Sequence, residues 1–136
     1  MLTQGLSQAQ VFGLIGFGGI FWAAAAITVC YAGHILYAND LRRLSIFIAS
    51  IPVIYIMLFI SEGFLGISSK QRLISVVIMT ATALLMDGVG FMWFPTLYEN
   101  PLLKKKNSQL AISVSRMGAA WILWGAGLGL WVALLT

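Results

Sequence analysis

Charged residues are scarce in this sequence: Asp, Glu, Lys and Arg together make up 9% of its 136 residues, and only four of them are acidic. Soluble globular domains carry about 25% charged residues, so this chain lacks the polar surface that a soluble fold exposes. Its hydrophobic residues, 60% of the total, fall in long runs without the amphipathic periodicity of soluble helices. The sequence therefore predicts an integral membrane protein.

Metal-binding and catalytic side chains are also scarce. Cys30 and His34 are the only residues of their kinds, so no intramolecular disulfide can form and no cluster has the spacing of a metal or haem site. Patterns typical of a nucleophile elbow, a phosphate loop or a catalytic triad are missing. No basic surface interleaved with aromatic residues favours nucleic acid. We expect no metal, no cofactor, no nucleic-acid partner and no enzyme activity.

Four apolar runs dominate the chain, separated by short polar stretches. They cover approximately residues 11–37, 44–65, 73–94 and 109–135. A helix of about 20 residues crosses the hydrocarbon core of a bilayer, so each run is long enough to span it. The first run has no basic segment before it and no convincing cleavage site, which favours a retained span over a signal peptide. We predict one all-α transmembrane domain over residues 1–136, an antiparallel bundle of four transmembrane helices.

A faint internal repeat joins the two halves of the chain. Leu36–Arg43 resembles Leu97–Lys104, because each contains Leu-Tyr-x-Asn followed by basic residues. Duplication would make the protein two similar helical hairpins related by an axis along the membrane normal. The alternative is that both segments have the interfacial tyrosine and basic loop common to membrane helices.

Basic residues are unevenly distributed between the loops. Loops 38–43 and 95–108 contain Arg42, Arg43, Lys104, Lys105 and Lys106, whereas the middle loop contains only Lys70 and Arg72. By the positive-inside rule, we expect these two loops in the cytoplasm and both termini outside. The five basic residues are then placed to contact lipid head groups.

An acidic residue within the third apolar run is the main candidate functional residue. Asp87 lies eight residues before Pro95, about 12 Å below that membrane surface, where an unpaired charge costs at least about 2.5–3.5 kcal/mol. Arg116 lies at a similar depth if the fourth run starts at the same surface. We therefore predict an Asp87–Arg116 contact. It would fix helix register, form a substrate or proton site, or bind another membrane subunit.

Two further features bear on function. His34 lies near the end of the first run, where it either approaches Asp87 or Arg116 as a proton relay or meets the interface. Small residues at a spacing of four, Gly19 with Ala23 and Gly125 with Gly129, favour close helix packing in lipid. We expect membrane lipids as partners. The glycine-rich faces also predict either a homo-oligomer or a larger membrane-protein complex.

Several short motifs point to a family. They are Leu84–Asp87, Phe94–Pro95, Tyr98, Asn100, Trp121–Gly125 and Tyr31–His34. Together they resemble an uncharacterised family of small four-helix bacterial membrane proteins, known as a domain of unknown function. The resemblance implies a four-span fold and supplies no activity, substrate or cofactor. We expect the bacterial inner membrane as the location.

Two functional hypotheses remain open at this point. The first is a structural or accessory membrane subunit without enzymatic activity. The second is a small-molecule or proton-coupled transporter with an intramembrane site at Asp87 and Arg116.

Overall fold

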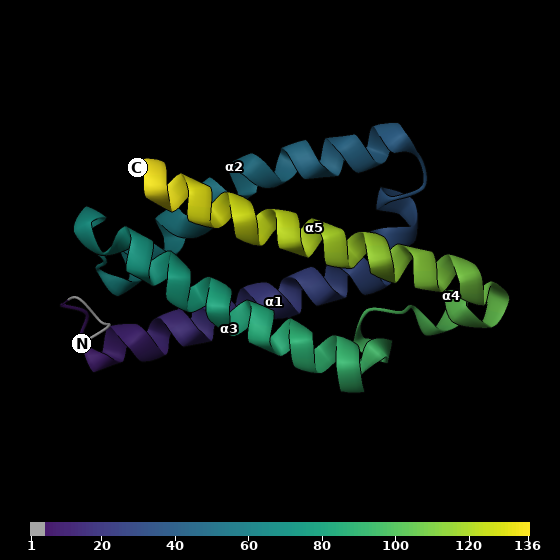
Figure 1. Cartoon of the computed structure of the whole chain (residues 1–136), viewed down its shortest axis with the longest axis horizontal. Helices are drawn as coiled ribbons and strands as arrows, with labels where there is room; N and C mark the ends of the chain where they lie inside the picture. Colours follow the sequence, from purple (N-terminus) through teal and green to yellow (C-terminus); the bar gives the residue numbers. More distant parts are fainter. Residues whose placement is uncertain (1–4) are drawn as a thin grey trace.

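Four long helices correspond to the four apolar runs in the structure, a computed structural model that describes residues 5–136 (Figure 1). They are α1 (Gln8–Leu36), α2 (Asp40–Leu65), α3 (Arg72–Trp93) and α5 (Ser108–Leu135). Each is long and apolar enough to cross a membrane, and a helix satisfies its own backbone hydrogen bonds there. The predicted all-α four-helix bundle is confirmed; residues 1–4 of the predicted domain lie outside the described part.

Short helices occupy two of the connections. The 3₁₀ helix η1 (Ser69–Gln71) precedes α3, while η2 (Pro95–Leu97) and α4 (Pro101–Lys106) join α3 to α5. The sequence did not predict α4. Its start is defined by Asn100, whose side chain accepts hydrogen bonds from the amides of Leu102 and Leu103 at 2.9 and 3.2 Å. Such an asparagine cap, followed by a proline, is a typical helix start.

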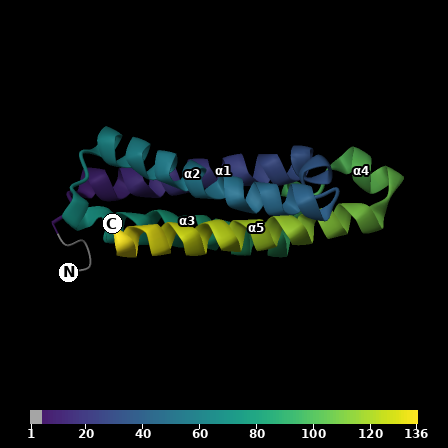
Figure 2. The same cartoon turned by 90° about the horizontal axis from the view of Figure 1, so that it is seen from above.

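The long helices pack antiparallel in two layers, with α1 and α2 in one and α3 and α5 in the other (Figure 2). Helix α1 contacts the other three long helices, whereas α2 packs mainly on α1 and α5. The beginning of α1 and the end of α5 lie at the same end of the bundle (Figure 1). We call the opposite end, which contains the α1–α2 turn and α4, the α4 end.

Glycines bring particular helix pairs close together. A Cβ atom on Gly18 of α1 would lie 2.6 Å from the carbonyl oxygen of Met79 in α3. Gly33 of α1 lies equally close to Val114 of α5, and Gly118 of α5 packs against Val29 of α1. These contacts allow the backbones to approach in lipid, where dispersion and close packing hold helices together.

The glycines that the sequence predicted to pack closely make no close contact with another helix of the same chain within residues 5–136. A Cβ atom on Gly19 or Gly129 would make an ordinary contact at 3.7 Å, and one on Gly125 would have nothing within 4 Å. The spacing-of-four motif therefore did not identify the close intramolecular contacts. Which glycine faces a neighbouring backbone depends on its position along the bundle axis and on the rotation of its helix. The spacing of glycines in the sequence determines neither of these.

The repeated Leu-Tyr-x-Asn segments have similar local structures. Tyr37 and Tyr98 are both buried, and each packs against a glycine of the preceding helix, Gly33 and Gly90 respectively. Asn39 then caps α2 by accepting from the amide of Arg42, as Asn100 caps α4. The asparagine cap explains why α2 begins at Asp40, four residues before the apolar run.

Candidate functional site

The carboxylate of Asp87 is the centre of a buried polar cluster. Tyr98 Oη donates a hydrogen bond of 2.6 Å to Asp87 Oδ1 and accepts one of 3.0 Å from Trp22 Nε1. These three side chains, the Asp87 cluster, come from α3, the η2–α4 connection and α1. Asp87 is 7% exposed and Tyr98 is completely buried. The cluster therefore joins the α4 connection to two membrane-spanning helices.

Tyr98 reaches Asp87 because the chain turns back after α3. Its ring stacks on Phe91 with centroids 3.8 Å apart, and its hydroxyl lies over Gly90, where a Cβ atom would be 2.7 Å away. Asp87 and Gly90, three residues apart, share one helix face and so form a notch for the tyrosine. Burial first, and then the hydrogen bond to the Asp87 carboxylate, raise the pKa of Tyr98 above its usual value, so it is a hydrogen-bond donor at neutral pH.

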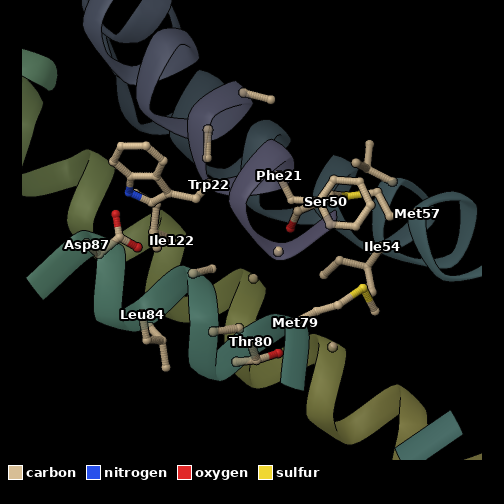
Figure 3. Close-up of a pocket in the computed structure, with 18 of the residues that line it drawn as sticks. Phe21, Trp22, Ser50, Ile54, Met57, Met79, Thr80, Leu84, Asp87 and Ile122 are labelled. Atoms are coloured by element: carbon tan, nitrogen blue, oxygen red, sulfur yellow. The ribbon is translucent and has the colours of Figure 1, made fainter. Parts of the chain in front are cut away.

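A cavity of about 370 Å³ lies beside the cluster, lined by all four long helices. Figure 3 shows Trp22 from α1, Ser50 and Met57 from α2, Asp87 from α3 and Ile122 from α5 around it. The other lining residues are apolar or small, with hydroxyls at Thr28 and Thr80. Ser50 and Thr28 already donate to backbone carbonyls of their own helices. We call this space the central cavity.

In the part of the chain that the structure describes, Asp87 is the one ionisable side chain that lines the central cavity. Within residues 5–136, Oδ1 accepts from Tyr98, whereas Oδ2 has no hydrogen-bond donor. In Figure 3 one carboxylate oxygen points toward the Trp22 indole and the other toward Ile122. The carboxylate is thus held on one side and open on the other.

The predicted contact between Asp87 and Arg116 is wrong. The ion pairs found among residues 5–136 are Asp40–Arg43, Glu62–Arg72 and Glu99–Lys104. Arg116 is exposed on α5, and at the depth of Asp87 this helix presents Trp121 and Ile122 to the cavity.

The error arises from where α5 begins. Helix α4 and the first turns of α5 project beyond the ends of the other long helices (Figures 1 and 2), so α5 does not start level with the end of α3. Arg116 lies five residues nearer the α4 end than Trp121, a difference of about 7.5 Å along the helix. That offset places it too far out to reach Asp87.

His34 also lies apart from the Asp87 cluster. It is exposed in the last turn of α1, twelve residues beyond Trp22, which is about 18 Å along the helix. The structure therefore does not bring Asp87, Arg116 and His34 together. Trp22 and Tyr98, which sequence analysis did not include in the site, are the neighbours of Asp87.

An ion pair that the sequence did not predict lies at the other end of the bundle. Arg72 Nε and Nη2 donate to Glu62 Oε1 and Oε2 at 2.5 and 2.9 Å, and both side chains are partly buried. This bidentate pair joins the end of α2 to the start of α3. A smaller cavity of about 130 Å³, lined also by Tyr55, adjoins it.

The basic residues predicted to meet lipid head groups all lie at the α4 end. Arg43 pairs with Asp40 at 2.6 Å and Lys104 with Glu99 at 2.5 Å, while Arg42 donates to the carbonyl of Ile35. Lys105 and Lys106 are exposed on α4.

Comparisons with protein-family models, curated proteins and solved structures found no match to this chain. The resemblance to the uncharacterised bacterial family therefore stays a prediction. In residues 5–136 no three His, Cys, Asp or Glu side chains come together to hold a metal ion. The Asp87 cluster and the central cavity are therefore the features that bear on function.

Proposed function

We propose that the protein binds a small, largely apolar molecule inside the membrane, in the central cavity beside Asp87. The observation that supports this most is a carboxylate in the wall of a cavity of about 370 Å³ that all four helices line. Sites for small molecules are typically clefts of about 300–1,000 Å³, mostly apolar, with a few well-placed polar groups. The central cavity has this size and this composition.

The surroundings of Asp87 favour binding over a purely structural role. A carboxylate that only fixes helix register would have both oxygens satisfied in a dry contact, because unpaired polar groups in lipid are costly. Here Tyr98 satisfies Oδ1 and the space next to Asp87 is open. Asp87 belongs to the proposed site, as it does in the transporter hypothesis, but Arg116 does not. Release of the ligand to either side of the membrane would make the protein a carrier.

A structural or accessory role is the second candidate. Four glycines on the outer surface, Gly16, Gly63, Gly88 and Gly127, are exposed and would have nothing within 4 Å of an added Cβ atom. Small residues on a lipid-facing surface allow another helix to approach closely. A second copy of the chain or another membrane subunit would then pack there.

We further propose that the protein resides in the bacterial inner membrane with the α4 end in the cytoplasm and both termini outside. Support comes from charge: Arg42, Arg43, Lys104, Lys105, Lys106 and Arg116 lie toward the α4 end, against Lys70 and Arg72 at the other. Such an excess of basic residues is typical of cytoplasmic loops. Lys105, Lys106 and Arg42 are the best placed to contact anionic lipids.

Two glycine variants on α5 test the proposed function. Gly125 lines the central cavity and Gly127 faces outward, and neither has an atom within 4 Å of an added Cβ. Gly125→Leu fills cavity space, while Gly127→Leu adds the same side chain outside. Each protein is purified in mild detergent and its bound small molecules are identified by native mass spectrometry.

The expected result is a small molecule retained by the wild type and by Gly127→Leu but lost from folded Gly125→Leu. A ligand retained by all three proteins would place binding elsewhere. Recovery of a second protein subunit and no small molecule would favour the accessory role instead.

A further inference from the structure

As far as residues 5–136 are concerned, the central cavity has one charged group and no opposite charge. Asp87 is the one ionisable residue of this range that lines it, and the ion pairs in the same range do not include Asp87. An ionised carboxylate in a low-dielectric region is strongly disfavoured unless a positive charge compensates it. Among residues 5–136 no side chain supplies that charge, so either a proton on Asp87 or a bound cation must remove the uncompensated charge.

The position of the open oxygen indicates where such a group would bind. Tyr98 holds Oδ1 from behind the cavity wall, and Trp22 in turn donates to Tyr98. This arrangement fixes the rotamer of Asp87 and leaves Oδ2 as the oxygen available to a ligand. A hydrogen-bonded carboxylate that is fixed in advance loses little entropy when a ligand binds.

Two tryptophans line the cavity near Asp87. Trp22 belongs to the Asp87 cluster and Trp121 packs on the buried group that includes Tyr98, whereas Phe21 lies farther along the cavity, beside Ser50 and Met57 (Figure 3). The faces of aromatic rings attract organic cations, tryptophan most strongly, and do so more when the cation is desolvated. The remaining lining is apolar, which suits a compact hydrophobic body attached to the charge.

We propose that the central cavity takes an organic cation, an ammonium group on a compact apolar body, with its positive charge against Asp87 Oδ2. This inference rests on the proposed function and names the ligand class for that site. Neutral apolar molecules would fill the same space without compensating the carboxylate, so the cation binds more tightly than a neutral molecule of the same shape.

Proton exchange accompanies this binding. When the cavity is empty, a proton on Asp87 removes the uncompensated charge; when the cation binds, the carboxyl releases that proton and the cation takes over its charge. Among the described residues 5–136, Tyr98 is the one titratable group hydrogen-bonded to Asp87, and α1, α2 and α5 present none to the cavity. Because proton and cation compete for one carboxylate, cation affinity rises with pH, by at most about tenfold per pH unit.

A matched pair of ligands tests the ligand class. Benzyltrimethylammonium and neopentylbenzene have the same shape and differ in charge. Binding of each to the protein in lipid nanodiscs is followed by intrinsic tryptophan fluorescence, with the two ligands at equal mole fraction in the lipid. Asp87→Asn removes the charge and keeps an oxygen that can accept from Tyr98; Asp40→Asn, at an exposed carboxylate, is the control.

The expected result is that the wild type and Asp40→Asn bind the cation at least about tenfold more tightly than the neutral ligand, a readily measured difference. Asp87→Asn should bind both about equally. Equal binding of the two ligands by the wild type would overturn the ligand class and leave the proposed function standing. If the wild type bound neither, both would be overturned. The comparison within the wild type does not depend on the folding of any variant.

Discussion

Tyr98 donates a hydrogen bond of 2.6 Å to Asp87, although Tyr98 follows the end of α3 and Asp87 lies within it. The bond connects a polar loop at the α4 end to a carboxylate within the membrane-spanning part of the chain. The same hydroxyl also accepts a hydrogen bond from the Trp22 indole. The tyrosine hydroxyl therefore contributes both to the stability of the fold and to the position of Asp87 in the proposed binding site.

Tyr98→Phe should destabilise the fold, because both Asp87 Oδ1 and Trp22 Nε1 lose their partner. A buried polar group left unsatisfied costs about 1–3 kcal/mol. The measurement is the midpoint of unfolding in a denaturing detergent. Tyr31→Phe, which removes an exposed hydroxyl, is the control and should leave the midpoint unchanged. Equal stability of the two variants would contradict the assigned role of Tyr98.

Replacing Arg116 distinguishes the observed arrangement from an ion pair with Asp87. Arg116 is exposed, so Arg116→Gln should change stability by no more than about 0.5 kcal/mol. Breaking a buried ion pair would cost about 3–5 kcal/mol. The same unfolding assay separates the two values, and a loss in the larger range would show that Arg116 does reach Asp87.

The close approach of α1 and α3 predicts opposite behaviour for two neighbouring glycines. Gly18→Ala places a methyl group 2.6 Å from the backbone carbonyl of Met79, whereas Gly16→Ala meets nothing within 4 Å. Overpacking against backbone costs about 1–3 kcal/mol, so Gly18→Ala should lower the thermal midpoint. Gly16→Ala should maintain or slightly raise it. Tolerance of both substitutions would mean that the two helices are not in close contact.

Alkaline pH should weaken the fold through Tyr37, the residue after α1. Burial raises the pKa of Tyr37 from 10.0 to about 12, so between these values the unfolded chain loses a proton that the folded chain retains. Its contribution is complete below pH 10 and is lost as pH rises toward 12, at about 1.4 kcal/mol per pH unit. Tyr37→Phe should therefore show a shallower alkaline loss of stability than the wild type or Tyr31→Phe. Parallel pH profiles for the three proteins would contradict it.

The helices were predictable because hydrophobic run length alone determines where a chain can cross a membrane. The site was less so. Asp87 was identified from its rarity in an apolar run, but its partner depends on the depth at which α5 begins. The extension of α4 and α5 beyond the other helices determines that depth (Figure 2), and no local pattern in the sequence contains it.

Tyr98 was missed for a related reason. A tyrosine after a helix end suggests a position at the membrane interface, and the sequence does not show that the chain turns back toward α3. One signal was available: Asp87 and Gly90 lie on the same helix face, and that leaves a gap beside a carboxylate. A side chain with a hydroxyl within reach would be expected to fill it.

Labelling of Asp87 with a lipophilic carbodiimide tests the central claim most directly, that this carboxylate is open to small molecules in the membrane. The carboxyl adds across a C=N bond of the reagent, and the adduct is located by peptide mass spectrometry. We predict labelling at Asp87 in the wild type and in Gly127→Leu, and its loss in Gly125→Leu, where the added side chain occupies the cavity. An Asp87 that stays unlabelled in the folded wild type, while exposed Asp40 reacts, would show that the carboxylate is enclosed and would contradict the account.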